Sequence, residues 1–264
     1  MSLTAHLIST IIVLIIVSAI GFLSSKNVKT SGDFTLGGRR LSTVQVAGSI
    51  VATLIGGAST IGTSQLAFQK GVNAMWFTIG ASCACIFLGY FLAEPLRNEE
   101  VETISQYMSN NYGMSIGIFI SLFTSLAMFI HVIGQILSSV AILGSVFNIG
   151  IILAAIITIL FILSYIFFGG FLGTSIVGIL KTILLYITLL SSGYIIYRGF
   201  GGVQGISADF PKEPWLNLFS DGILNGFGQG FTLVVGVSST QTYLQAMFGG
   251  KTGKQSKRGA YLSA

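Results

Sequence analysis

The stretch IVATLIGGASTIGTSQLAF, residues 50–68, decides how this sequence is interpreted. Its length and its apolar ends are typical of a helix that crosses a lipid bilayer, which needs about 20 apolar residues. In its middle, however, residues 56–60 are Gly, Gly, Ala, Ser and Thr. A spanning helix is normally richest in large apolar side chains at that depth, so this run needs an explanation.

Two interpretations of the small residues follow from their spacing. Gly48, Ala52 and Gly56 are four residues apart, and such a stripe lets a neighbouring helix approach closely. Alternatively, the glycine pair unwinds the helix, which exposes carbonyl oxygens and half-helix dipoles that can hold a cation or a polar solute. On the second interpretation, residues 45–68 form two half-helices that meet near Gly56 to Ser59.

The composition indicates a protein embedded in lipid. Hydrophobic residues make up 52% of the chain and charged residues only 8%, against roughly 25% in soluble domains. The excess of 13 basic over 8 acidic residues gives no reason to expect nucleic acid as a partner. Cys83 and Cys85 lie two apart in an apolar run, which fits neither a metal nor a redox pair, so we expect both to be buried packing residues.

The apolar segments predict an all-α polytopic membrane protein. The first segment is expected to be an uncleaved lead helix, because its apolar stretch is longer than the usual 7–15 residues of a signal peptide. Residues 103–108 are expected to form a short surface helix. A window of about 20 residues gives seven segments, at 5–24, 45–68, 72–96, 113–146, 149–170, 173–198 and 219–248.

Basic residues in the loops predict the orientation. Cytoplasmic loops of membrane proteins are enriched in Lys and Arg. Nine of the basic residues fall on one side of the predicted membrane, which places the N-terminus outside a multi-pass protein of the cell membrane. These nine are Lys26, Lys29, Arg39, Arg40, Arg97, Lys251, Lys254, Lys257 and Arg258.

Four stretches together resemble one transporter family. They are DFTLGGRRLSTVQVAGSIVATLIGGASTIGTSQLAF at 33–68, ETISQYMSNNYG at 102–113, YIFFGGFLGT at 165–174 and TQTYLQAMFGGKTGKQSKRGA at 240–260. In sequence and order they are similar to the sodium:solute symporter family, which includes carriers of proline, sugars, pantothenate and sialic acid. The resemblance covers nearly the whole chain.

The resemblance implies a LeuT-type fold, in which two inverted five-helix repeats follow one extra helix. Residues 5–24 then form the extra helix, 45–198 the first repeat, and 219–264 the start of the second. The chain is expected to be one incomplete transmembrane domain, which contains core helices one to six and the start of core helix seven. The missing C-terminal helices of the same fold are expected to be its partners. Expressed alone, it is expected to show no sodium-driven uptake.

The resemblance also implies a cation site. The family's sodium ion is held by backbone carbonyls of core helix one and by oxygens of core helix eight. Aligning the Gly-Ala-Ser run places the first set on the carbonyls of Ala58 and Ile61. Thr60 stands where some members carry Asp, so a carboxylate-assisted site is not expected. Sodium is the expected coupling ion, and no other metal or cofactor is expected.

We place the solute contacts at the break, on Gly57, Ser59 and Thr60, and on Gln241 in the sixth core helix. That helix lacks the Asn and Tyr arrangement of the sugar carriers, so another small polar organic solute is favoured. Elsewhere, His131 and Gln135 are four residues apart on one helix. An interhelical hydrogen bond is the favoured interpretation of this pair, and a place along a transport pathway is the alternative.

Lys181 is the least expected residue of the sequence. It lies about eight residues into its helix, or about 12 Å at 1.5 Å per residue, where an ammonium is costly. In related amino-acid carriers of the same fold, a lysine on core helix five can take the place of sodium. Its ammonium would then point at the carbonyls of Ala58 and Ile61, and coupling would be to protons. The plain alternative is snorkelling with a satisfied hydrogen bond.

Two kinds of function remain open from the sequence. The first is a secondary carrier that uses a cation gradient to take up a small polar organic solute by alternating access. The second is a sensor module, because the same membrane domain occurs fused to signalling kinases. If the protein ends at Ala264, it is expected to transport nothing by itself. No His-Glu-x-x-His, phosphate-loop or Gly-x-Ser-x-Gly motif is present, so the protein is not expected to be an enzyme.

Overall fold

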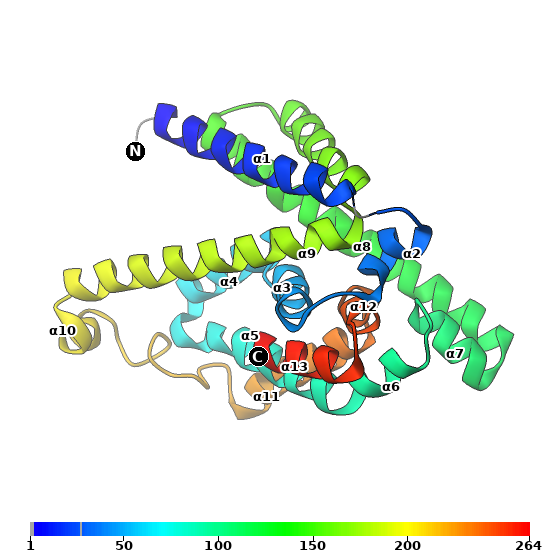
Figure 1. Ribbon diagram of the computed structural model, residues 1–264. Helices are drawn as coiled ribbons and strands as arrows, with labels where there is room; N and C mark the ends of the chain where they lie inside the picture. Colours follow the sequence, from blue (N-terminus) through cyan, green and yellow to red (C-terminus); the bar gives the residue numbers. More distant parts are fainter. Residues whose placement is uncertain (1–2, 27) are drawn as a thin grey trace.

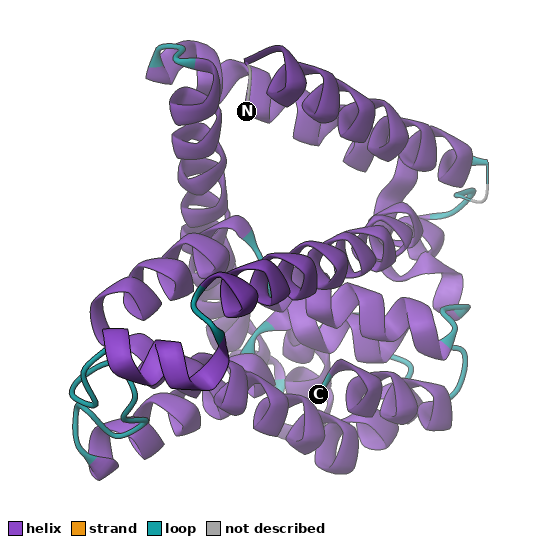
Figure 2. Ribbon diagram, turned by 90° about the vertical axis from the view of Figure 1, so that its left-hand side faces the viewer, coloured by secondary structure: helices purple, strands orange, loops and turns teal. Residues whose placement is uncertain are grey.

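The computed structural model describes residues 3–26 and 28–264, and helices dominate this part of the chain (Figures 1 and 2). The first helix, α1 (Leu3–Ser25), packs along α9 (Ile151–Gly199). The short α2 (Ser31–Leu36) and η1 (Gly37–Arg39) lead into α3 (Thr43–Leu54). The remaining bounds are α4 (Gly57–Lys70), η2 (Gly71–Ala74), α5 (Met75–Phe87), η3 (Leu88–Leu92), α6 (Ala93–Asn98), α7 (Ile104–Tyr112), α8 (Met114–Phe147), α10 (Gly202–Asp209), α11 (Ile223–Ser239), α12 (Gln241–Gly249) and α13 (Gly253–Ser263).

The chain is an all-α multi-pass membrane protein. Within the described residues, four stretches are long and apolar enough to cross a bilayer, at 7–24, 57–98, 114–147 and 169–199. Only 6% of the most apolar window of α8 is buried inside the protein. Such an exposed apolar surface is compatible with lipid and not with water. Each of the seven predicted apolar segments is mainly helical. Segments 45–68 and 219–248 are each interrupted between two helices, and 72–96 runs through η2, α5, η3 and α6.

The best-buried core lies where α3, α5, α12 and α13 meet, and Figure 1 shows these helices side by side. Val46 and Ile50 of α3 are fully buried against Leu244 and Phe248 of α12. A parallel bridge between Leu41 and Gly250 ties the loop before α3 to the end of α12. Helix α3 is therefore anchored, and it can serve as a fixed wall for the site described below.

The glycine pair inside α9 turns the chain between the predicted segments 149–170 and 173–198. Gly170 has φ 51° and ψ −155°, so the helix is interrupted there although the residues on either side are helical. A Cβ on Gly170 would lie 3.0 Å from the carbonyl oxygen of Phe34. Gly169 packs against Gly21 of α1, where a Cβ would lie 3.1 Å from the Cα atom. Both positions need glycine because backbone approaches backbone.

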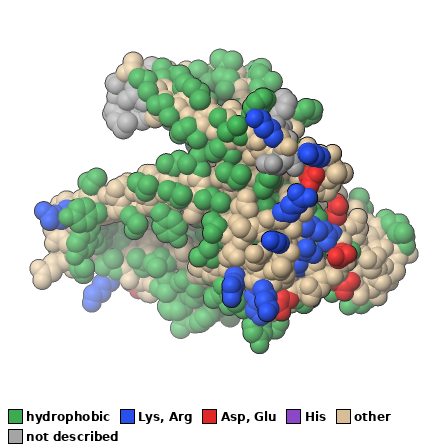
Figure 3. Space-filling view, viewed as in Figure 1, with side chains coloured by type: hydrophobic (Ala, Val, Ile, Leu, Met, Phe, Trp, Pro, Cys, Tyr) green, Lys and Arg blue, Asp and Glu red, His purple; other side chains and the backbone are tan. Residues whose placement is uncertain are grey.

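Charged side chains gather over the part of the surface formed by α2, α6 and α13 (Figure 3). There α2 begins with a capping box in which Thr30 and Asp33 exchange hydrogen bonds. The Thr30 hydroxyl and the backbone N–H of Lys29 donate to the Asp33 carboxylate, and these bonds lower the pKa of Asp33. The start of α2 is thus fixed by local side-chain contacts.

The two cysteines differ in their surroundings. Cys85 is buried, as expected, but Cys83 is exposed, so the prediction that both are buried packing residues is wrong for Cys83. The two residues are two apart on one helix and therefore point about 200° apart around its axis. One face of α5 meets the protein, and the other does not.

Candidate functional site

The predicted break in the first broken helix is confirmed, and it lies at Ile55 and Gly56. Helix α3 ends at Leu54 and α4 begins at Gly57. Gly56 has φ −80° and ψ −179°, an extended conformation that stops the helical ladder. The last bond of the first half runs from Ile55 N–H to the Val51 carbonyl, and the first of the second half from Thr60 N–H to the Gly56 carbonyl. Backbone groups between these bonds need other partners.

Side chains supply several of these partners. Lys181 of α9 donates from Nζ to the Ala52 carbonyl, 3.1 Å away. Ser59 donates from its hydroxyl to the Leu54 carbonyl, at 2.8 Å, and so bridges the break. On the other side, the backbone N–H of Ala58 donates to Oε1 of Gln135 on α8, with 3.4 Å between nitrogen and oxygen. The break is therefore held by contacts from two neighbouring helices.

The charge distribution at these two caps follows the helix dipoles. An ammonium is favourable at the C-terminal end of a helix, and an electron-rich oxygen at the N-terminal end. Lys181 occupies the first kind of position, at α3, and the Gln135 oxygen the second, at α4. The arrangement stabilises two helix ends that face each other inside an apolar protein.

Helices α3 and α9 cross closely beside the break. A Cβ on Gly178 would lie 2.5 Å from the carbonyl oxygen of Gly48 and 2.9 Å from the Cβ of Ala52. A Cβ on Gly48 would lie 3.0 Å from the backbone nitrogen of Ile179. The small-residue stripe Gly48-Ala52 is thus a packing surface, while Gly56 belongs to the break. The packing interpretation is confirmed for Gly48 and Ala52, and the helix break is confirmed at Gly56, while the binding of a cation or solute there stays a prediction.

Two cavities adjoin the break. The first, of about 750 Å³, lies between α4, α5 and α11, and its lining includes Ser59, Thr63 and Gln229. The second, also of about 750 Å³, is bordered by α1, α3, α8, α9 and α12. Gln135 and Lys181 line this second cavity. Polar groups from the broken helix and from its neighbours therefore reach both spaces.

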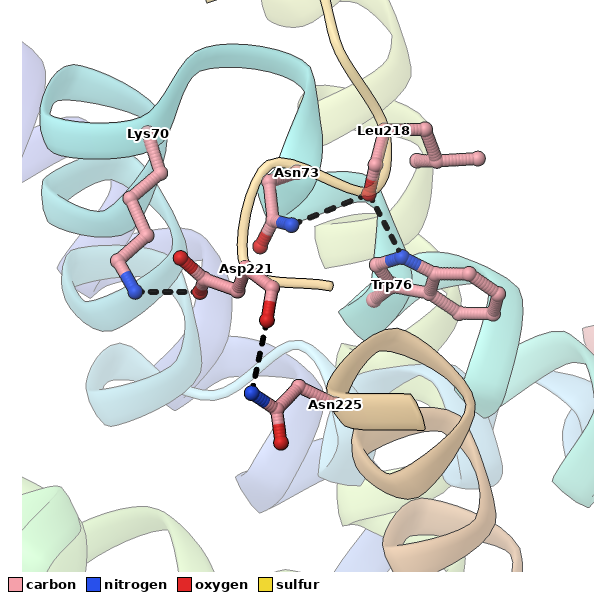
Figure 4. Close-up of polar contacts among 6 residues, drawn as sticks. All are labelled: Lys70, Asn73, Trp76, Leu218, Asp221 and Asn225. Carbon is pink, nitrogen blue, oxygen red and sulfur yellow. Dashed lines mark hydrogen bonds and ion pairs between the residues drawn. The ribbon is translucent and has the colours of Figure 1, made fainter. Parts of the chain in front are cut away.

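A strap of polar contacts connects the α4–α5 turn to the loop before α11 (Figure 4). The Lys70 ammonium pairs with the Asp221 carboxylate. Asn73 and Trp76 both donate to the carbonyl of Leu218, at 3.1 and 2.9 Å. Asp221 also borders the first cavity. The far end of α4 is therefore tied to the start of α11 at the mouth of that cavity.

The predicted cation ligands lie just beyond the break. Ala58 and Ile61 are in the first two turns of α4, where helical carbonyls accept from N–H groups four residues on. Ala58 borders the first cavity. The Lys181 ammonium does not point at this pair as the proton hypothesis required, because its hydrogen bond goes to Ala52 in the preceding half-helix. The α3–α9 crossing sets that geometry.

The predicted solute contacts are partly brought together. Gly57 lines the second cavity and Ser59 the first, on the two sides of the break. The Thr60 hydroxyl donates to the Gly56 carbonyl at 2.8 Å. Gln241 lies elsewhere, and its side chain binds the backbone of Glu102 and Ile104. The Gln241 amide thus holds the loop before α7 against the start of α12.

A second broken helix was not predicted from the sequence. Helix α11 ends at Ser239 and α12 begins at Gln241, with Thr240 extended between them at φ −91° and ψ 125°. The available signal was the run Ser238-Ser239-Thr240, since Ser and Thr favour helix ends. Thr242, in the first turn of α12, lines the second cavity. Two interrupted helices therefore border the same region.

Acidic and sulfur ligands do not cluster in the described residues: no group of three His, Cys, Asp or Glu there is placed to hold a metal ion. Oxygen ligands from carbonyls and hydroxyls suit hard cations such as sodium, and they need no such cluster. The break offers ligands of this kind through Ala58, Ser59 and Thr60.

Gln135 makes the interhelical hydrogen bond that was the favoured interpretation of the His131 and Gln135 pair. Both residues also border the second cavity.

Comparison with known proteins supports a transport role. A family model described as "Sodium:solute symporter family" matches residues 34–214, which is more than half of the chain. The chain is also 27% identical over 202 residues to a protein of Bacillus subtilis (strain 168) described as "Uncharacterized symporter YwcA". That match covers 76% of the chain and 39% of the relative. The chain thus spans less than half of the length of this relative.

Proposed function

Because the chain belongs to the sodium:solute symporter family, we propose that it forms part of a secondary carrier that takes up a small polar organic solute together with a cation. The observation that carries this proposal is the break at Ile55 and Gly56, whose backbone groups are held by side chains from α8 and α9. Interrupted helices at membrane depth are tolerated where they are buried in protein or line a cavity. The break here does both.

In this proposal sodium binds at the carbonyls of Ala58 and Ile61, together with oxygens supplied by the rest of the carrier. The solute binds beside it, at Gly57, Ser59 and Thr60. Cation binding favours the arrangement of the half-helices that also holds solute, so each ligand raises the affinity for the other. Alternating access then carries both across the bilayer. Gln241 acts in this scheme through the start of α12 that it holds, directly after the second break at Thr240.

A proton-coupled version is the second candidate, and the position of Lys181 favours it. The ammonium already lies at the C-terminal end of α3, where a positive charge is stabilised by the helix dipole. Loss of its proton would remove that charge and loosen the contact with Ala52. The expectation that it replaces sodium at Ala58 and Ile61 is not part of this version. Coupling through a proton on Lys181 and coupling through sodium at Ala58 can be distinguished by experiment.

We further propose that the N-terminus lies outside the cell membrane. The gathering of Lys and Arg over α2, α6 and α13 supports this orientation, since such residues are enriched on cytoplasmic surfaces (Figure 3). In that orientation, the Lys70–Asp221 pair faces outward, and Asp221 borders the first cavity.

The test is uptake by the full-length carrier in proteoliposomes, with sodium and pH gradients imposed separately. The leading proposal predicts that an inward sodium gradient concentrates at least one solute of a panel of amino acids, sugars, carboxylates and their amides. The proton version predicts the same result from a pH gradient, and its loss in Lys181→Ala. If every solute of the panel only equilibrates across the membrane under both gradients, the proposal of a secondary carrier is overturned.

A further inference from the structure

The turn between α5 and α6 is not a regular α-helical turn. In η3, Leu88–Leu92, the backbone N–H of Ala93 donates to the carbonyl of Leu88, five residues back. An α-helix bonds to the fourth residue back, so η3 is a π-turn that holds one extra residue. We propose that η3 is a hinge at which α5 and α6 bend relative to each other when the carrier changes state. This inference rests on the proposed function, because it assigns the hinge to the conformational cycle of that carrier.

Pro95 explains why the irregular turn lies at this point of the sequence. Proline has no backbone N–H, so residue 95 cannot donate to the carbonyl of Phe91, four residues back. In a regular helix the proline ring would also clash with that carbonyl. Prolines and π-turns are the places where helices kink by more than about 20°. The α5–α6 helix therefore has a built-in place to bend.

Above the π-turn, α5 is tied to α11. The two helices lie side by side along their length (Figure 1). A Cβ on Gly80 of α5 would lie 2.8 Å from the Cα of Gly230 on α11, so backbone meets backbone there. Because backbone atoms in such a contact cannot give way separately, α5 and α11 are expected to move together.

Below the π-turn, α6 is tied to the end of α12 and the start of α13. Arg97 of α6 donates from Nε to the carbonyl of Gly250, the residue after α12. A Cβ on Gly253, the first residue of α13, would lie 3.3 Å from the Cα of Glu94 on α6. The second half of the same helix is thus held by a different group of partners.

The second break and the π-turn separate the same two groups of helices. Thr240 lies between α11, which is tied to α5, and α12, whose end is tied to α6. Thr240 is ten residues before Gly250, or about 15 Å at 1.5 Å per residue, and η3 lies about 8–14 Å before Arg97 on the same measure. The two irregular points are therefore at a similar depth. A change of angle at Thr240 needs a matching change in the α5–α6 helix, which η3 can supply.

The contact at the π-turn itself is softer than those on either side. A Cβ on Gly89 would lie 2.7 Å from Cε1 of Tyr261 on α13, so the backbone of η3 faces the end of a side chain. A ring can turn about its side-chain bonds, whereas the backbone contacts of Gly80 and Gly253 cannot adjust in that way. Motion is therefore easier at η3 than above or below it.

Two variants straighten the turn. Pro95→Ala restores an N–H that can bond to the Phe91 carbonyl, which favours a regular helix. Pro95→Ala with deletion of Phe91 goes further, because Ala93 and Leu88 are then four residues apart and their bond becomes an α-helical one. The deletion removes the extra residue of the π-turn, so α5 and α6 keep their packing faces. Pro211→Ala, at a proline in the loop before α11, is the matched control.

The experiment measures distances between spin labels by double electron–electron resonance. The full-length carrier is reconstituted into lipid nanodiscs, in sodium or in an equal concentration of potassium, and other exposed cysteines, Cys83 included, are changed to serine. One pair, Leu224→Cys with Ile142→Cys, joins the start of α11 to α8. The other, Lys254→Cys with Ile118→Cys, joins the start of α13 to α8. The four positions are exposed, and the continuous helix α8 is the common reference.

We expect sodium to shift the distance of the α11–α8 pair and to leave that of the α13–α8 pair nearly unchanged. A bend of about 20° at Leu88 moves Met75, at the far end of α5, by about 7 Å, and α11 moves with α5. In the two straightened variants, the distances of both pairs are expected to shift together or not at all. Pro211→Ala is expected to behave as the wild type.

Three results would overturn the hinge. They are a shift confined to the α11–α8 pair in a folded Pro95→Ala protein with Phe91 deleted, equal shifts of both pairs in the wild type, and no shift of either pair in the wild type. Each can occur in a carrier whose gradient-driven uptake is intact, so each is distinguishable from failure of the proposed function, which uptake tests separately. Unfolding temperatures at least equal to that of the wild type establish that the variants fold. If the deletion does not fold, Pro95→Ala alone decides by the same criterion.

Discussion

Gln135 on α8 presents its side-chain oxygen to the backbone N–H of Ala58, the second residue of α4, with 3.4 Å between the two atoms. The contact joins a long, continuous helix to the start of the second half-helix. A cap of this kind satisfies an N–H that the helix itself leaves without a partner. The same side chain lies directly over Gly56, so the break and the cap depend on each other.

Gly56→Ala is therefore expected to act through Gln135. The backbone at Gly56 has an ordinary negative φ, so alanine causes no strain there, but its Cβ would lie 2.5 Å from Oε1 of Gln135. The amide must move and lose its bond to Ala58. We expect Gly56→Ala and Gln135→Ala to lower the unfolding temperature and the sodium-driven uptake of the full-length carrier to a similar extent. Each loss corresponds to about 1 kcal/mol, as for other helix caps.

The double variant decides whether the two residues share one contact. If they do, Gly56→Ala with Gln135→Ala is no worse than either change alone, because the second change has nothing further to remove. Full additivity of the two effects would show that Gly56 acts independently of Gln135.

Gly178→Ala is expected to separate α9 from α3. Its Cβ would meet the Gly48 carbonyl oxygen at 2.5 Å, and a backbone atom cannot give way as a side chain does. We expect a loss of about 1–3 kcal/mol in stability, typical of overpacking, measured as a lower unfolding temperature in detergent. Gly193→Ala on the same helix meets nothing within 4 Å and is the control. Equal unfolding temperatures for both variants would contradict the close crossing.

Gly71→Ala is expected to disrupt the strap between α4 and α11. Gly71 has φ 60°, and its Cβ would lie 2.1 Å from the carbonyl oxygen of Trp215. Because backbone strain and the steric clash add, the loss of folding stability exceeds the roughly 1–3 kcal/mol that a strained residue alone costs. Gly113→Ala also has a positive φ, but nothing lies within 4 Å of its Cβ, so it measures strain without a clash. A smaller loss at Gly71 than at Gly113 would refute the role of the strap contact.

Asp33→Asn is expected to destabilise the carrier in a pH-dependent way. Hydrogen bonds from the Thr30 hydroxyl and the Lys29 N–H lower the pKa of Asp33 below its ordinary 3.8. The ionised carboxylate therefore contributes stability above that value, and the contribution is lost as the pH falls through the lower folded pKa. The gap in unfolding temperature between wild type and Asp33→Asn should be largest near neutral pH and shrink below about pH 4. The exposed Asp209→Asn serves as control, and a gap independent of pH would argue against the cap.

The first break was predictable because its cause is local. Two glycines followed by Ala, Ser and Thr weaken a helix wherever it packs, and the helix is indeed interrupted at Ile55 and Gly56. The second break, at Thr240, was missed for a physical reason. Thr240 is extended at a negative φ that any residue adopts, so no glycine is needed and none marks the position.

Contacts between segments that are distant in the chain could not be predicted from the sequence. The family resemblance led us to expect the Lys181 ammonium at the broken helix, but the carbonyl that it meets depends on how α3 and α9 cross at Gly48 and Gly178. The pairing of Gln241 with the backbone of Glu102 and Ile104 joins residues far apart in the chain. Residue patterns give the type and depth of a polar group, whereas its partner is set by packing.

The coupling cation is proposed to bind at the break. Hydrogen–deuterium exchange of the full-length carrier, followed on the peptide that contains residues 54–61, tests it most directly. A cation bound at the carbonyls of Ala58 and Ile61 stabilises the start of α4 against local opening, and so slows exchange there. We predict slower exchange of this peptide in sodium than in an equal concentration of potassium, with no change in α13. Equal exchange in both salts, at a sodium concentration that drives uptake, would contradict it.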